Sequence, residues 1–355
     1  MMSTPKSFMH LTEKDQSEIF RDYASITPNR GIEIAEKDLW VCWVLKMLFE
    51  MPNHLDMAFK GGTSLSKVFN VIDRFSEDID ITLDYRQFKA IDELHLEENQ
   101  TAPKHIGSAV SRRINKKLEL EVRSYAEDVV APYLREMVAK LPRSELFKIE
   151  LNEKGDAIEF TFPSIQKSDQ RQGYMLQYIL IEFGGRNIIE PNDIYHVTPY
   201  MADSYTDFEF PSSMVTVLSA HRTFWEKATL IHVECHRGVR QDAARLSRHW
   251  FDLMSLSNHT IGQNAIQDVN LLKDVVALKN IFFNAGYANY PKCLSGDFVL
   301  LPDDLGIRQL RVDYEKMIES NYLNDSTISF DQIIQSTQRT QDLINQVIKD
   351  HNLKA

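Results

Sequence analysis

The chain carries the sequence Phe59-Lys60-Gly61-Gly62-Thr63-Ser64-Leu65 and, shortly after it, Arg74-Phe75-Ser76-Glu77-Asp78-Ile79-Asp80-Ile81. The first stretch predicts a strand over 54–60, a tight turn at the two glycines and a helix over 63–71. The second predicts a strand over 76–83, because apolar residues alternate there with polar ones. Strand, glycine turn, helix and second strand are therefore expected in close succession.

Two aspartates in the second stretch indicate metal chemistry. Asp78 and Asp80 lie two residues apart on the predicted strand, so their side chains project from one face about 6.5 to 7 Å apart. Two carboxylates at that spacing can converge on one or two Mg²⁺ ions, or Mn²⁺ in their place, together with the phosphates of a nucleoside triphosphate. The alternative is an ordinary edge strand with a solvated outer face.

The glycine turn favours the metal interpretation. Gly61 and Gly62 let the backbone approach a phosphate closely, and free N–H groups at the start of the next helix attract an anion. The hydroxyls of Thr63 and Ser64 can add hydrogen bonds. We therefore expect residues 61–64 to bind the nucleotide.

A third carboxylate is expected from a different strand. The run 175–183 is apolar on both faces, which predicts a central strand, and Glu182 stands at its end just before two glycines. A charged group there costs free energy unless it is paired or bound to a metal. Glu182 is therefore the candidate that completes the metal site and activates the attacking hydroxyl, as two-metal displacement requires. The alternative is that Glu182 has reached the solvent-exposed end of its strand.

The rest of the chain divides into a mixed first part and a helical second part. Residues 1 to about 30 are polar and irregular. Helices are expected over 35–50 and 105–140 and strands over 147–151 and 157–162, whereas from residue 213 nearly all segments have helical periodicity. These helices are expected at 215–236, 242–257, 264–283, 303–320 and 329–350. The fold class is α+β: a small mixed sheet flanked by helices in a nucleotidyltransferase-like α/β domain (1–212), with a helical C-terminal domain (213–355).

Composition narrows the classes of protein that this chain can represent. Its 355 residues are 43% hydrophobic and 26% charged, which is typical of a globular protein with a sizeable core. Three widely spaced cysteines indicate a reducing compartment, and no signal pattern or membrane-spanning stretch is evident, so a cytoplasmic protein without membrane contact is expected. The formal net charge of −11 argues against general coating of nucleic acid.

Two local basic segments could still bind RNA. They can equally be solvated helix faces, and the sequence alone does not decide between these readings. The residues are Lys104, Arg112, Arg113, Lys116, Lys117 and Arg123 in the first segment, and Arg237, Arg240, Arg245 and Arg248 in the second.

The glycine turn and the aspartate pair together resemble the AbiEii/AbiGii toxin family, which belongs to the polymerase-beta-like nucleotidyltransferase superfamily. The resemblance covers about residues 35–260. It includes the later stretches Phe224-Trp225-Glu226-Lys227-Ala228 and Ser247-Arg248-His249-Trp250-Phe251-Asp252-Leu253. By this resemblance Lys227 contacts the triphosphate and Asp252 orients it. Both lie among apolar neighbours, so we expect these opposite charges to face each other.

The resemblance implies a Mg²⁺-dependent nucleotidyltransferase toxin of an abortive-infection or toxin–antitoxin system. It would transfer a nucleoside monophosphate from a triphosphate to an RNA acceptor, with transfer RNA as the leading candidate. Two alternatives stay open: nucleotidylation of a protein or small molecule, and a non-catalytic module that only senses nucleotide. A cognate antitoxin is an expected partner, with its direct contact left open.

Overall fold

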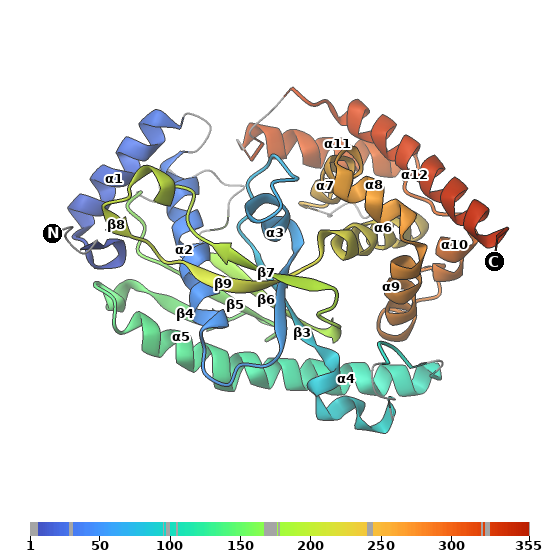
Figure 1. The fold of residues 1–355 in the computed structure, drawn as a ribbon, viewed down its shortest axis with the longest axis horizontal. Helices are drawn as coiled ribbons and strands as arrows, with labels where there is room; N and C mark the ends of the chain where they lie inside the picture. The colour runs from blue at the N-terminus through green and yellow to red at the C-terminus, as the bar shows by residue number, and fades with distance from the viewer. Residues whose placement is uncertain are drawn as a thin grey trace.

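A seven-stranded mixed β-sheet lies at the centre of the molecule, with strand order β4-β5-β6-β3-β2-β9-β7 (Figure 1). Its strands are β2 (Met57–Lys60), β3 (Ile79–Asp84), β4 (Lys148–Leu151), β5 (Ala157–Thr161), β6 (Ile179–Asn187), β7 (Asn192–Val197) and β9 (Ser213–Leu218). A separate parallel pair consists of β1 (Lys6–Ser7) and β8 (Phe208–Glu209).

The computed structural model describes residues 6–27, 31–94, 96, 100–103, 106–166, 176, 178–239, 244–320, 322–323 and 327–354. The first helices are α1 (Glu13–Ile26), α2 (Ile32–Phe49), α3 (Gly61–Lys67), α4 (Ser108–Ser124), a π-helical segment (Tyr125–Val130) and α5 (Ala131–Val138). The later helices are α6 (Ala220–Arg237), α7 (Ser247–Asn258), α8 (Thr260–Gln267), α9 (Val269–Phe282), α10 (Tyr290–Ser295), α11 (Asp304–Glu319) and α12 (Phe330–Asn352). Short 3₁₀ helices occupy Phe8–His10, Tyr85–Gln87, Lys89–Leu94, Ser144–Leu146 and Ala202–Ser204.

The register of the central strands sets three charged residues side by side. β2 pairs antiparallel to β3 with Lys60 opposite Asp80, and β3 pairs parallel to β6 with Asp80 opposite Glu182. Residues directly opposite each other in a sheet project from the same face. A charged row therefore crosses three strands on one face of the sheet.

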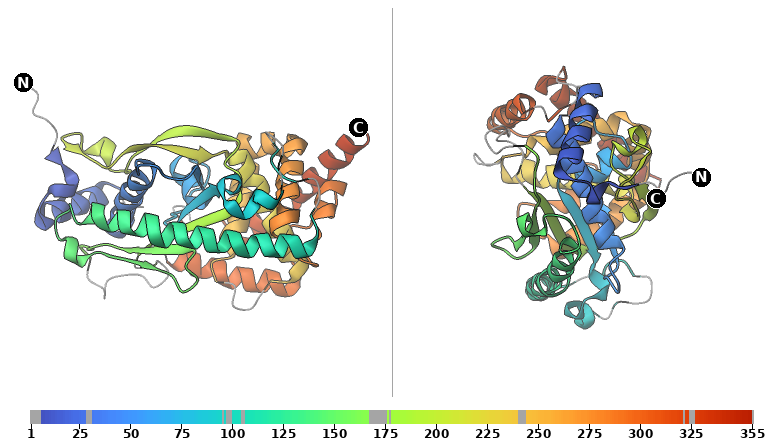
Figure 2. Two further views of the ribbon diagram at one scale, coloured as in Figure 1. Left: turned by 90° about the horizontal axis from the view of Figure 1, so that it is seen from below. Right: turned by 90° about the vertical axis from the view of Figure 1, so that its left-hand side faces the viewer.

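The opposite face of these strands is apolar and is covered by helices. On α2, Trp43 stacks on Phe160 of β5 with ring centroids 5.5 Å apart. The long helix formed by α4, the π-helical segment and α5 runs along the sheet (Figure 2), and Tyr125 meets Phe183 of β6 edge-on at 6.3 Å. This packing leaves only the charged face of the sheet free to form a site.

Helices α6 to α12 gather beyond the charged face and form a second hydrophobic core (Figure 1). Trp225 and Trp250 are fully buried there. Their indole N–H groups donate to the carbonyl oxygens of Ala265 (3.0 Å) and Leu300 (2.9 Å). None of the helices in the described part of the chain combines the length and the apolar character needed to cross a membrane.

The expected fold class, a mixed sheet flanked by helices with helices at the C-terminal end, is confirmed. The expected strand–turn–helix–strand succession is also present, although the glycines already belong to the first turn of α3. The division into domains 1–212 and 213–355 stays a prediction. The sheet takes in β9, so the change from strands to helices falls at Ser219.

Four element predictions are wrong. The helix expected over 264–283 is divided at Asp268 into α8 and α9. The helix expected over 215–236 begins only at Ala220, because Val215 and Val217 alternate with polar or exposed neighbours in β9. The N-terminal region expected to be irregular contains α1, whose start is capped by the Thr12 side chain accepting from Asp15 N–H. The strand expected to end at Glu182 continues to Asn187, since Gly184 and Gly185 still pair or pack within the sheet. Met175, the first residue of that expected strand, and Asp242, the first residue expected in another helix, lie outside the described residues.

Substitutions at two adjacent glycines on opposite faces of β6 test the packing of α4 against the sheet. A Cβ at Gly185 would lie 2.4 Å from Cγ2 of Val122 on α4, whereas a Cβ at Gly184 would meet only the carbonyl oxygen of Ile81 at 3.8 Å. Gly185→Ala should therefore lower the free energy of unfolding by about 1–3 kcal/mol through overpacking. Gly184→Ala should not lower it. Urea denaturation of both variants measures the difference, and equal stabilities would contradict the proposed covering of this face by α4.

Candidate active site

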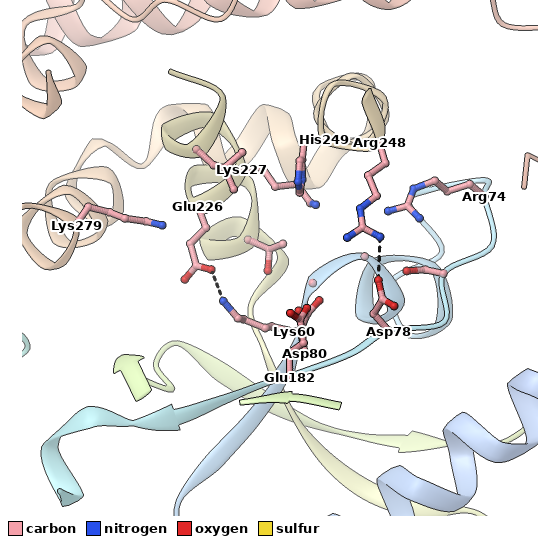
Figure 3. A pocket seen from close by; sticks show the side chains of 15 residues that line it. Lys60, Arg74, Asp78, Asp80, Glu182, Glu226, Lys227, Arg248, His249 and Lys279 are labelled. Carbon is pink, nitrogen blue, oxygen red and sulfur yellow. Dashed lines mark hydrogen bonds and ion pairs between the residues drawn. The ribbon is translucent and has the colours of Figure 1, made fainter. Parts of the chain in front are cut away.

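A cavity of about 310 Å³ lies between the charged face of the sheet and helices α6, α7 and α9 (Figure 3). Its sheet side carries the row of Lys60, Asp80 and Glu182, and Asp78 joins them from the residue just before β3. All three carboxylates named from the sequence therefore line one cavity. Glu182 is open to this cavity from the middle of its strand, not from a strand end.

Asp78 is turned toward a cation. Arg248 of α7 donates to Asp78 Oδ2 at 2.9 Å (Figure 3), while Asp78 Oδ1 is buried and has no hydrogen-bond partner among the described residues. Behind it, the fully buried Glu77 accepts hydrogen bonds from the Tyr322 hydroxyl (2.9 Å) and from Arg245 (3.2 Å). These contacts fix the backbone of the residues that enter β3. One carboxylate oxygen of Asp78 thus remains available in a buried position.

The glycines are needed for contacts within the protein. Gly61 has φ of +81°, which favours glycine, and a Cβ there would lie 1.9 Å from Asp80 Oδ2. A Cβ at Gly62 would lie 2.6 Å from Arg74 Nη2. The absence of side chains at these positions therefore lets Asp80 and Arg74 reach the cavity, a role additional to the phosphate contact expected from the sequence.

Thr63 and Ser64 lie behind the cavity. The Thr63 hydroxyl donates to the Asp78 carbonyl oxygen (2.5 Å) and is 2.9 Å from the Ser76 hydroxyl. The Ser64 hydroxyl donates to the Gly61 carbonyl oxygen at 3.0 Å. Both residues are buried, so in this arrangement they hold α3 and the strand entry together, and their contact with a nucleotide stays a prediction.

A buried cluster of charges closes the cavity on the helical side. Asp252 of α7 is fully buried and accepts from Lys227 of α6 at 2.8 Å, as expected from their apolar surroundings. It also binds Arg74 with both oxygens, at 2.7 Å to Nε and 2.8 Å to Nη2. Burial alone would raise the pKa of the Asp252 carboxyl, but the two cations outweigh burial and hold that pKa well below its usual range. The cluster joins the loop before β3 to α6 and α7.

Several cavity residues were not recognised from the sequence. Lys60 pairs with Glu226 at 3.2 Å, and Arg248 was assigned only to a basic segment. Arg74, Glu226 and Lys279 also line the cavity. The quoted motifs contain Arg74, Glu226 and Arg248, so their position in these motifs could have indicated that they belong to the site. Lys279 lies on a helix that carries no motif.

Burial and neighbouring charges shift the pKa values of two carboxyl groups and one histidine at the cavity. Burial, together with the charges of Asp80 and Asp78, raises the pKa of Glu182 to about 7. The pKa of Asp80 is also raised by burial, an effect that Lys60 opposes. Burial and the nearby Lys227 hold the pKa of His249 well below its usual range, so its ring is neutral near pH 7.

Some residues of both basic segments form ion pairs within the protein. In the first, Arg113 and Lys117 both bind Glu93. In the second, Arg245 and Arg248 turn inward to Glu77 and Asp78. Lys104 and Arg240 lie outside the described residues.

Comparison with known proteins identifies the chemistry. The model of the protein family described as "Nucleotidyl transferase AbiEii toxin, Type IV TA system" matches residues 43–336. Among solved structures the chain is similar to MenT4, a nucleotidyltransferase toxin from Mycobacterium tuberculosis H37Rv, with 15% identity, a TM-score of 0.41 and coverage of 89% of this chain and 92% of that one. A comparison with curated protein sequences finds no match.

The buried charge cluster yields a stability prediction. Asp252→Asn removes the carboxylate charge that Arg74 and Lys227 share, so the free energy of unfolding should fall by about 3–5 kcal/mol. Urea denaturation measures the loss. The same substitution at the exposed Asp193 of β7 is the matched control and should change little. Equal stability of the two variants would show that the cluster is not a structural link.

Proposed function

Because the chain belongs to the AbiEii nucleotidyl transferase toxin family of type IV toxin–antitoxin systems, we propose that it transfers a nucleoside monophosphate from a nucleoside triphosphate to a hydroxyl of RNA. Transfer RNA is the leading acceptor, and the reaction depends on Mg²⁺ or Mn²⁺. The observation that carries this proposal is the meeting of Asp78, Asp80 and Glu182 at one cavity whose other wall is cationic.

The carboxylates suit a divalent metal that arrives with its substrate. Within the described residues, no group of three His, Cys, Asp or Glu side chains is already arranged to hold a metal ion. Mg²⁺ needs only one or two carboxylates, with phosphate oxygens and water completing its shell. The buried Asp78 Oδ1 without a partner and the neighbouring Asp80 provide such donors, and Glu182 is the candidate third ligand. A metal bound there would neutralise charge that develops on the phosphates.

Other side chains at the cavity bind the triphosphate and accept the proton of the attacking hydroxyl. Lys227, Arg74 and Arg248 present positive charge to the triphosphate, and Asp252 holds the first two in place. Glu182 accepts the proton of the attacking hydroxyl. The acceptor oxygen bonds to the α-phosphorus, the bond from that phosphorus to the bridging oxygen breaks, and pyrophosphate leaves toward the cations.

A protein or a small molecule is the second candidate acceptor. The net charge of −11 favours it, since a polyanion is repelled by an acidic surface. The cavity chemistry is the same for either acceptor. A cognate antitoxin completes the proposed system, which acts in the cytoplasm.

Labelled nucleotides distinguish the acceptors. Purified protein, Mg²⁺ and each α-³²P nucleoside triphosphate in turn are incubated with total RNA and with a protein extract. We expect label on RNA of transfer RNA size, and its loss when the metal is chelated. Label on protein alone would replace RNA as the acceptor, and label on neither fraction with any nucleotide would contradict the proposal.

Asp80→Asn tests the metal site. The substitution keeps the shape of the side chain but removes a charge, so transfer should fall by on the order of a thousandfold, equivalent to several kcal/mol of transition-state stabilisation. Asp193→Asn on an exposed strand position is the matched control and should retain activity. Initial rates at saturating triphosphate and Mg²⁺ provide the measurement. An active Asp80→Asn enzyme with unchanged metal dependence would rule out this site.

A further inference from the structure

A second cavity, of about 170 Å³, adjoins the first. The two share Lys60, Glu226 and Lys279 in their linings. The second cavity is smaller than the roughly 300–1,000 Å³ typical of whole ligand pockets, so it suits a single nucleoside. The family match and the predicted site residues assign no ligand to it.

The floor of the second cavity continues the catalytic face of the sheet. Thr82 and Gly184 are paired opposite each other, two residues beyond Asp80 and Glu182 on the same strands. Residues two apart on a strand share a face. Because Gly184 has no side chain, this part of the floor is open, and a Cβ there would meet nothing closer than the Ile81 carbonyl oxygen at 3.8 Å.

The lining of the second cavity combines apolar side chains with a hydroxyl that makes no hydrogen bond within the described residues. Val275 and Leu278 of α9 are buried, and Phe283 at the end of that helix is 42% exposed. The Thr82 hydroxyl is fully buried on the floor and has no hydrogen-bond partner within the described residues. Unpaired bases are recognised by apolar or aromatic walls together with hydrogen bonds to their edges.

Four cations and one carboxylate line the cavity: Lys60, Arg186, Arg222, Lys279 and Glu226. Arg186 also pairs with Glu119 at 3.2 Å. Arg186 and Lys279 both approach the Phe283 ring, at 5.2 Å and 4.6 Å from its centroid. In the described part of the chain, Lys279 has no carboxylate within ion-pair distance. Burial, together with the nearby cations Lys60 and Arg222, lowers the pKa of Lys279 to about 8. An anion beside Lys279 would relieve this repulsion.

The position of the second cavity matches the side from which an acceptor must come. In displacement at phosphorus, the attacking and leaving oxygens lie roughly in line on opposite sides. Arg74 and Arg248 lie beside Asp78, whereas Lys279 lies beyond Glu226 on the opposite side of Asp80 and Glu182 (Figure 3). If pyrophosphate leaves toward the arginines, the acceptor hydroxyl enters from the side of Lys279.

We infer that the second cavity binds the 3′-terminal nucleoside of a single-stranded RNA acceptor. This inference rests on the proposed function. The base lies between the α9 wall and the Thr82 hydroxyl, and the phosphate that precedes it lies beside Lys279 and Arg186. The terminal ribose hydroxyl then faces Glu182 at the junction of the two cavities.

Gly184→Leu tests the inference by filling the floor. Binding of a non-hydrolysable triphosphate with Mg²⁺ should remain unchanged, whereas the KM for the RNA labelled by the native protein should rise by at least about tenfold, as expected for loss of one base contact. Gly184→Ala fills the floor less and should have a KM between those of the native protein and Gly184→Leu. Thermal unfolding of each variant verifies the fold. A native KM for RNA in a folded Gly184→Leu protein would overturn the inference.

Lys279→Met tests the charge, with Lys273→Met at an exposed position of the same helix as its control. The first variant should bind RNA more weakly and with a smaller salt dependence, since it removes one phosphate contact, and the second should match the native protein. Identical behaviour of the two variants would contradict a phosphate beside Lys279.

A cross-linking measurement separates this inference from the proposed function. A short single-stranded RNA ending in 4-thiouridine is bound to the native protein and irradiated, and the modified peptide is identified by mass spectrometry. Cross-links within 275–283 or 184–187 support the cavity assignment even if no nucleotide is transferred, in which case only the proposed reaction fails. Cross-links confined to other segments would overturn the assignment even if RNA is labelled.

Discussion

The structure depends on one buried ion pair network, in which Asp252 holds Arg74 and Lys227 across the cavity. Arg74 comes from the loop that leads into β3, and Lys227 and Asp252 come from two helices of the second core. The network is therefore a direct polar link between the sheet and the helices that face it. Without Asp252, two cations would remain in a desolvated space beside the cavity.

Such a network defines geometry more than it adds stability. The attraction among buried charges offsets the cost of removing them from water, and replacing them with apolar side chains often stabilises a protein. Cations beside a triphosphate must, however, be in position before the substrate arrives. Asp252 holds Arg74 and Lys227 in place beside the cavity, which lowers the reorganisation needed on binding. The close contacts at Gly61 and Gly62 likewise hold the side chains of Asp80 and Arg74 in position.

The sequence was sufficient to predict those site contacts that depend on the local spacing of residues. Alternation over 76–83 placed Asp78 and Asp80 together, and the apolar neighbours of Lys227 and Asp252 predicted that these two charges meet. Arg248 was missed as a partner of Asp78 because the contact spans 170 positions of the chain, and no local pattern encodes it. Lys279 was missed for the same reason. The β9 strand was misassigned because it is short and α6 begins only two residues after it, so the helical periodicity of α6 dominated the wider stretch.

Net charge was the least informative property for function. A chain with a charge of −11 still gathers Lys60, Lys227, Arg248 and Lys279 around one cavity, while Arg113 and Lys117 on the outer surface are held by Glu93. These cations share the cavity with the carboxylates of Asp78, Asp80, Glu182 and Glu226, so opposite charges lie close together there. Cations grouped in this way act on a phosphate group at close range, because a cavity focuses the field of its own charges more strongly than a distant surface opposes it.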